Sequence, residues 1–130
     1  MILRGGANGP NYAADHIARA AAALARADLA PRVLIDCSHA NSGKDPARQP
    51  DVLREVAAQV AAGNPSILGV MLESFLVGGR QDVVTGTPLV YGQSITDGCL
   101  GWDATVPLLH ELAGAVRSAR AGAAVKAPLA

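Results

Sequence analysis

The sequence has 130 residues, enough for one ordinary domain but only about half of the ~250 residues typical of a closed barrel of eight β/α units. Half of the residues are hydrophobic and only 3% are aromatic, which indicates an α/β domain with small helix faces packed on a sheet. Eleven basic and eleven acidic side chains cancel, so the composition argues against binding to nucleic acid or to an anionic membrane. No apolar run approaches the ~18 residues of a membrane span and no signal peptide is evident, so we expect a cytoplasmic protein.

The first half of the chain alternates between predicted strands and helices. Residues 1–4 are typical of the end of a strand, which suggests that an upstream part of the fold lies outside this sequence. Asn11 is a candidate N-cap for a helix that runs to about Asp28, because the apolar residues after it repeat at helical spacing. A β-branched run predicts a buried strand at 33–37.

Polar and turn-forming residues follow this strand. We predict a loop at 38–50, then a helix whose valines share one face and which Gly63 ends as a C-terminal cap. A third apolar strand is predicted at 67–72. Short connections between alternating strands and helices predict parallel pairing.

Three chemically different side chains are each predicted as the last residue of a strand or its transition to a loop. They are Arg4, His39 and Glu73. Because parallel strands put their carboxyl ends at one edge, we expect these side chains to converge there. A cation, an imidazole and a carboxylate at one edge favour a binding site over the simpler interpretation of a surface ion-pair cluster.

The strand and helix repeat stops after Glu73. Residues 75–79 and 89–92 are predicted to form a β-hairpin inserted before the last helix, and its return limb leads to Asp97.

Thr105 is the predicted cap of that final helix, and Pro107 is tolerated because it falls in the first turn. We expect one domain over residues 1–120 and a frayed tail over 121–130.

The two cysteines, Cys37 and Cys99, lie in different predicted elements without CxxC spacing. This pattern predicts free thiols in a reducing compartment and does not indicate a zinc cluster.

Five segments of the sequence resemble, in order and spacing, the C-terminal part of class I 3-deoxy-D-arabino-heptulosonate 7-phosphate (DAHP) synthase. They are residues 3–6 (LRGG), 10–12 (PNY), 36–42 (DCSHANS), 69–74 (GVMLES) and 91–102 (YGQSITDGCLGW). The resemblance covers residues 1 to about 120 and implies the C-terminal portion of a (β/α)8 TIM barrel, with its last three β/α units. It also implies a metal-dependent transferase that condenses phosphoenolpyruvate with erythrose 4-phosphate, the first step of the shikimate pathway to chorismate and the aromatic amino acids.

The same resemblance implies roles for individual residues. His39, Glu73 and Asp97 match three of the family's metal ligands, and Arg4 and His39 match positions that bind substrate. One imidazole and two carboxylates suit manganese, iron, cobalt or zinc better than calcium, which prefers oxygen ligands alone. Arg4 offers the donor fork that recognises phosphate or carboxylate.

Several family features are missing or altered. The family's fourth ligand, a cysteine, and its catalytic lysine lie upstream of the matched part, so no residue here is assigned as catalytic. Gly78 and Arg80 stand where relatives usually carry an acidic residue and asparagine.

Three hypotheses follow from these departures. In the first, the chain is by family a DAHP synthase, and its activity depends on an upstream part that is supplied by a complementing N-terminal chain or lies outside this sequence; a homo-oligomer is a further expected partner. In the second, it is a truncated, non-catalytic remnant or interaction module. In the third, it is an independent metal- or phosphate-binding α/β module, which is disfavoured because three parallel strands leave open edges.

Overall fold

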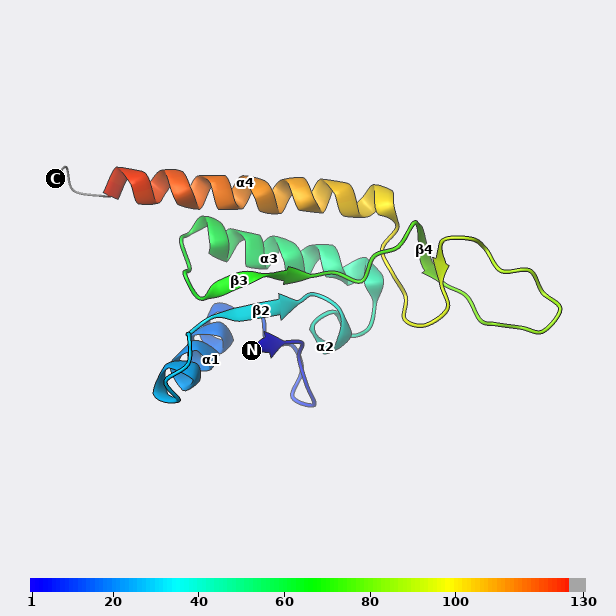
Figure 1. The fold of residues 1–130 in the computed structure, drawn as a ribbon, viewed down its shortest axis with the longest axis horizontal. Helices are drawn as coiled ribbons and strands as arrows, with labels where there is room; N and C mark the ends of the chain where they lie inside the picture. The colour runs from blue at the N-terminus through cyan, green and yellow to red at the C-terminus, as the bar shows by residue number, and fades with distance from the viewer. Residues whose placement is uncertain (127–130) are drawn as a thin grey trace.

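The computed structural model of the chain describes residues 1–126, which form an α/β fold with two parallel sheets (Figure 1). The elements follow in the order β1 (Ile2–Leu3), α1 (Ala14–Arg26), β2 (Val33–Asp36), α2 (His39–Ser42), the 3-10 helix η1 (Pro46–Arg48), α3 (Gln49–Ala61), β3 (Ile67–Met71), β4 (Val77–Arg80), β5 (Gln93–Ser94) and α4 (Trp102–Lys126).

The main sheet contains three parallel strands in the order β1-β2-β3, as the alternation of strands and helices predicted. Its register aligns Leu3 with Ile35 and Ile35 with Val70, so these side chains share one face. Leu3 and Ile35 are buried there against Ile17 of α1, while Ile2, which points to the opposite face, is 61% exposed. The helices therefore cover one face of the sheet, and within residues 1–126 the other face stays open.

The core lies between the sheet and helices α1 and α3. Val56 of α3 packs in the same cluster as Ile17 and Ile35, and all three are fully buried. Burial of one such side chain contributes about 1.5–3 kcal/mol. Figure 1 shows α4 beside α3, and Leu108 of α4 completes a second cluster with Leu53 of α3.

Asn11 does not cap α1, contrary to the prediction. The N-cap position is Ala13, whose side chain offers no acceptor, and α1 ends at Arg26 rather than at Asp28. The Asn11 carboxamide is instead engaged outside the helix, where its Oδ1 accepts a hydrogen bond from the Gly5 N–H at 2.8 Å.

The segment predicted as a loop at 38–50 contains two short helical turns, α2 and η1, and the first residues of α3. Pro50 lies at the start of α3, where its missing N–H costs no hydrogen bond. Gly63 follows α3 with a positive φ of 87°, as expected for a C-terminal glycine. The third strand ends at Met71, just before the predicted limit of 72.

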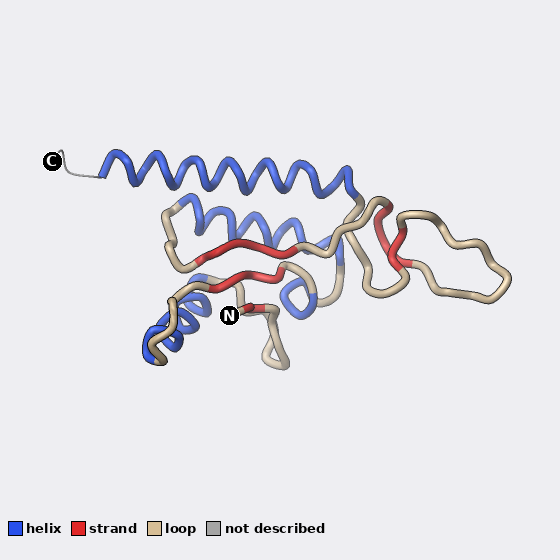
Figure 2. The backbone as a smooth tube through the Cα atoms, viewed as in Figure 1, coloured by secondary structure: helices blue, strands red, loops and turns tan. Residues whose placement is uncertain are grey.

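The predicted β-hairpin after Glu73 is wrong. β4 and β5 pair in parallel, with Val77 opposite Gln93, and residues 89–92 form no strand. Figure 2 shows that the connection between the two strands is a long open loop. The Gln81 side chain closes this loop by hydrogen bonds to both the N–H and the carbonyl of Val90, each 2.8 Å long, so the chain returns without an antiparallel ladder.

The last helix begins earlier and ends later than predicted. Thr105 is not its cap, because it lies inside α4 and its Oγ1 donates to the Gly101 carbonyl at 3.0 Å. Pro107 lies beyond the first turn of α4 and so costs it one backbone hydrogen bond. Residues 121–126 of the predicted frayed tail are helical, and 127–130 lie outside the described residues. Within the described chain, none of the helices combines the length and hydropathy that a membrane crossing needs.

Candidate metal centre

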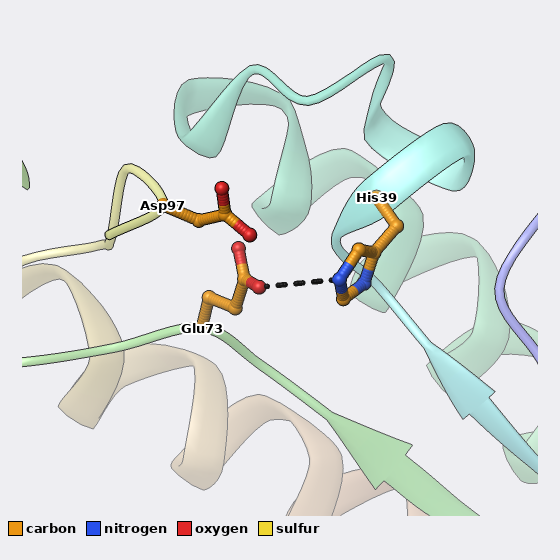
Figure 3. A group of neighbouring side chains, drawn as sticks. All are labelled: His39, Glu73 and Asp97. Carbon is orange, nitrogen blue, oxygen red and sulfur yellow. Dashed lines mark ion pairs between the residues drawn. The ribbon is translucent and has the colours of Figure 1, made fainter.

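The structure brings together the three residues predicted as metal ligands (Figure 3). One potential ligand atom from each of His39, Glu73 and Asp97 lies within 4.8 Å of the others, and His39 Nε2 is 3.5 Å from Glu73 Oε1. The three come from separate segments: His39 opens α2, Glu73 follows β3, and Asp97 follows β5. None is the last residue of a strand. Of the three side chains expected to converge at the sheet edge, His39 and Glu73 come together slightly beyond it.

Two neighbours in the chain, Asp36 and Ser38, orient the His39 imidazole by contacts to Nδ1, the ring nitrogen that does not face Glu73. Its Nδ1 lies 2.8 Å from Oδ2 of Asp36 and 2.6 Å from Oγ of Ser38. The Ser38 hydroxyl donates to the other Asp36 oxygen at 2.6 Å, so the proton between His39 and Asp36 belongs on Nδ1. When the ring is neutral, Nε2 then carries the free lone pair and faces Glu73, which is the arrangement that a metal ligand requires.

His39 also has an unusual backbone conformation. Its φ of 51° lies in the left-handed region, which few residues other than glycine adopt. Such a conformation costs of the order of 1–3 kcal/mol and persists where the surrounding contacts impose it. The imidazole of this residue is hydrogen-bonded to the carboxylate of Asp36, which is 3% exposed.

Glu73 is held by a side chain from a distant helix. The Gln49 carboxamide, fully buried at the start of α3, accepts from the Glu73 N–H at 2.8 Å and donates to its carbonyl at 3.1 Å. Burial raises the pKa of the Glu73 carboxyl; His39 opposes this shift, and the neighbouring Asp97 and Asp36 carboxylates add to it. A positive charge added beside Glu73 would therefore stabilise the ionised form of its carboxyl group.

Asp97 reaches the cluster because its segment docks beside Glu73. The Leu100 N–H donates to the Glu73 carbonyl at 2.9 Å, and the Phe75 N–H donates to the Leu100 carbonyl at 2.9 Å. The neighbouring Gly98 lies so near Pro46 that an added Cβ would sit 3.2 Å from the proline ring. The Asp97 side chain itself is exposed.

Arg4 follows β1 directly, at the carboxyl edge of the sheet, and its side chain is exposed. Within residues 1–126 its guanidinium takes part in no hydrogen bond or ion pair with the protein, and the contacts do not join it to the three-residue cluster. Its donors are thus available for an anionic group, and its predicted role in substrate binding stays a prediction.

Both cysteines are free, as predicted, and neither belongs to the cluster. Burial raises the pKa of the Cys37 thiol to about 12, and the Asp36 carboxylate adds to this rise, so the thiolate needed for metal binding is disfavoured. The Cys99 thiol points toward the Asp97 carbonyl, 3.6 Å away.

The sequence reasoning missed the buried amides that hold the edge of the sheet together. Asn41, fully buried, donates to the carbonyls of Leu3 and Asp36 and accepts from the Asn11 N–H. It thereby ties the end of β1 to the end of β2. The polar DCSHANS motif is the available signal for Asn41, whereas Gln49, placed in a predicted loop, left none.

The donor set fits a divalent transition ion. One imidazole nitrogen and two carboxylates converge, and borderline ions such as manganese, iron, cobalt and zinc accept this mixture of ligands. The raised pKa of Glu73 among like charges is the electrostatic situation that a bound cation relieves. The identity of the ion and the ligand roles remain predictions.

Comparisons with known proteins identify the family of the chain. A model of the DAHP synthetase I family matches residues 1–110. The tyrosine-inhibited phospho-2-dehydro-3-deoxyheptonate aldolase of Schizosaccharomyces pombe is 50% identical over 125 residues, covering 92% of this chain and 33% of the relative. The Phe-sensitive aldolase of Escherichia coli K12 is 50% identical over 120 residues, covering 92% of this chain and 34% of the relative.

A solved structure of phospho-2-dehydro-3-deoxyheptonate aldolase from Francisella tularensis SCHU S4 is similar with a TM-score of 0.86 and 47% identity. The similarity covers 91% of this chain and 34% of that chain. This chain thus spans about a third of the length of its relatives. Because the family match extends over most of the sequence, the chain belongs to the DAHP synthetase I family.

Proposed function

We propose that this chain is the C-terminal, metal-holding part of a DAHP synthase. The full reaction condenses phosphoenolpyruvate with erythrose 4-phosphate and water to give DAHP and phosphate. The observation that supports this most is the convergence of His39, Glu73 and Asp97 from three separate segments in a member of this family. A chance cluster of exposed acids would not include an imidazole oriented by a buried carboxylate.

Each residue has a distinct task in this proposal. Asp36 holds the proton on Nδ1 of His39 and so presents Nε2, while Glu73 and Asp97 contribute carboxylate oxygens. A divalent ion held by these groups would act as a Lewis acid on the aldehyde oxygen of the sugar phosphate. Arg4 donates to the phosphate or carboxylate of phosphoenolpyruvate, an interaction that its fixed donor fork favours.

The described chain does not supply every residue that the proposed reaction needs, such as the family's fourth metal ligand and catalytic lysine. We propose that the remaining part of a (β/α)8 barrel, supplied on the same or a separate chain, completes the site. β1 and β3 each have a free edge within the described residues, and Ile2 on the open sheet face is largely exposed. A groove of about 460 Å³ also lies open beside β3, lined mostly by apolar residues of β3, α4 and the segment between β3 and β4, among them Val70, Phe75 and Trp102.

Complementation tests this function directly. The chain is mixed with the upstream part of the Escherichia coli K12 relative, and consumption of phosphoenolpyruvate is followed with erythrose 4-phosphate and manganese. We expect no activity from either part alone, because residues that act as a unit lose many orders of magnitude in rate when several are missing. The mixture should be active, and His39→Ala or Arg4→Ala should abolish that activity.

Two results would contradict the proposal. Turnover by the isolated chain would show that the upstream residues are unnecessary. Metal binding by the chain without activity in any mixture would favour a non-catalytic metal-binding module.

A further inference from the structure

Gln49 is a fully buried polar residue that contacts none of the charged atoms of the candidate site. It is the first residue of α3, and the residue it contacts, Glu73, lies 24 positions later in the sequence. Burial of a carboxamide is unfavourable unless its donors and acceptor are paired. Gln49 meets this condition by pairing with the backbone of Glu73 rather than with its own helix.

The two hydrogen bonds act on both sides of the Glu73 Cα atom. Oε1 of Gln49 accepts from the Glu73 N–H at 2.8 Å, and Nε2 donates to the Glu73 carbonyl at 3.1 Å. Glu73 lies beyond the end of β3, so the ladder with β2 does not hold it. Fixing both peptide groups fixes the direction in which the Glu73 side chain leaves the backbone, and that direction is toward His39 and Asp97 (Figure 3).

The same turn also contacts the segment that carries Asp97. Pro46 opens η1, directly before α3, and packs against Gly98. Residues 46–49 therefore touch both segments that bring a carboxylate into the cluster. Neither contact uses a carboxylate oxygen, so neither competes with a ligand for these oxygens.

We infer that Gln49 is a positioning residue, which fixes the Glu73 carboxylate for binding a divalent cation through its two hydrogen bonds to the Glu73 backbone. This inference rests on the proposed metal site and adds to it a residue outside the ligand set. Residues that orient metal ligands typically change metal affinity by about 10–100-fold when they are replaced.

A titration of the chain with Co²⁺ alone tests the inference, with affinity measured by calorimetry and ligand geometry by visible absorption. Gln49→Met keeps the length of the side chain and removes both hydrogen bonds. We expect it to weaken Co²⁺ binding at least about 10-fold and to change the visible spectrum of the bound ion. In a Glu73→Ala background the same substitution should cause no further loss, because its effect passes through Glu73.

Gln59→Met provides the matched control. Gln59 also lies on α3 and donates from its carboxamide to a distant backbone carbonyl, that of Tyr12, at 2.9 Å. It is about 15 Å farther along the helix, at 1.5 Å per residue, so its loss should destabilise the fold without changing Co²⁺ affinity. If Gln49→Met does not fold, as judged by circular dichroism, Gln49→Glu replaces it, since this variant keeps the acceptor and loses only the donor.

The possible results separate the inference from the site on which it rests. Co²⁺ binding by the wild-type chain and by Gln49→Met with equal affinity and equal spectra would overturn the inference alone. An additive loss in the Glu73→Ala background would assign Gln49 a structural role only and would also overturn it. Absence of Co²⁺ binding by the wild-type chain would overturn the metal site and the inference together.

Discussion

Replacement of Asn41 by leucine should destabilise the chain strongly, although the two side chains have similar shapes. Asn41 is fully buried and makes three hydrogen bonds, to the carbonyl of Leu3 at 3.1 Å, to the carbonyl of Asp36 at 2.8 Å, and from the N–H of Asn11 at 2.8 Å. Leucine leaves all three backbone groups without this partner. At about 1 kcal/mol or more for each group, the free energy of unfolding should fall by about 3 kcal/mol.

Urea denaturation followed by circular dichroism measures this change, with Asn64→Ala as the control. Asn64 accepts one hydrogen bond, from the Ser66 N–H at 3.0 Å, and it is only partly buried. Its replacement should cost about 1 kcal/mol or less. A loss below about 1 kcal/mol for Asn41→Leu, or equal losses for the two variants, would refute the reasoning that Asn41 holds β1 to β2.

Four further predictions follow from the described contacts. Gly98→Ala should lower the metal affinity of the chain in a calorimetric titration, because its Cβ would lie 3.2 Å from Pro46 and displace the adjacent Asp97; an unchanged affinity would contradict this. A thiol reagent at pH 8 should modify Cys99 in the folded chain and Cys37 only after unfolding, and rapid reaction of both would be inconsistent with a buried Cys37. The raised pKa of Cys37 favours its protonated form in the folded state, so this contribution to stability is complete below about pH 8.5, the usual thiol pKa, and should be lost as the pH rises toward 12. Finally, the free edges of β1 and β3 and the open groove should make the isolated chain self-associate or bind a hydrophobic dye, whereas a monodisperse monomer without dye binding would argue against exposed apolar surface.

The sequence was informative where one local pattern determines one element. Val33 and Ile35 alternate toward the core within β2, and Ile17, Ala21 and Leu24 repeat along α1. These periods specify buried faces, and the short connections between them specify parallel pairing. The approach of His39 to Glu73 then follows from topology, because β2 and β3 are parallel and end at a common edge. Asp97 follows β5 of the second sheet, and only the family resemblance pointed to it.

Features that depend on distant side chains left no comparable signal. The loop between β4 and β5 was predicted as a hairpin from its turn residues, but hydrogen bonds from Gln81 to Val90 close it without an antiparallel ladder. The hydrogen bonds between Gln49 and Glu73 join residues 24 positions apart, and the hydrogen bond from Asn41 to Leu3 joins residues 38 positions apart. A single sequence marks such residues only as polar, and it does not distinguish a buried amide from a solvated one.

Several features that are unfavourable in the protein alone occur together at the candidate metal centre. His39 adopts a left-handed backbone conformation at the start of a helix, whereas Asp28 and Lys44, which also have positive φ, follow helix ends. Burial raises the pKa of Glu73, and the carboxylates of Asp97 and Asp36 raise it further. Close packing does not hold the three side chains together, because Asp97 is exposed. In the proposed function, a divalent cation held by these residues would bind the imidazole that the left-handed backbone presents and would balance the charge of the carboxylates beside it.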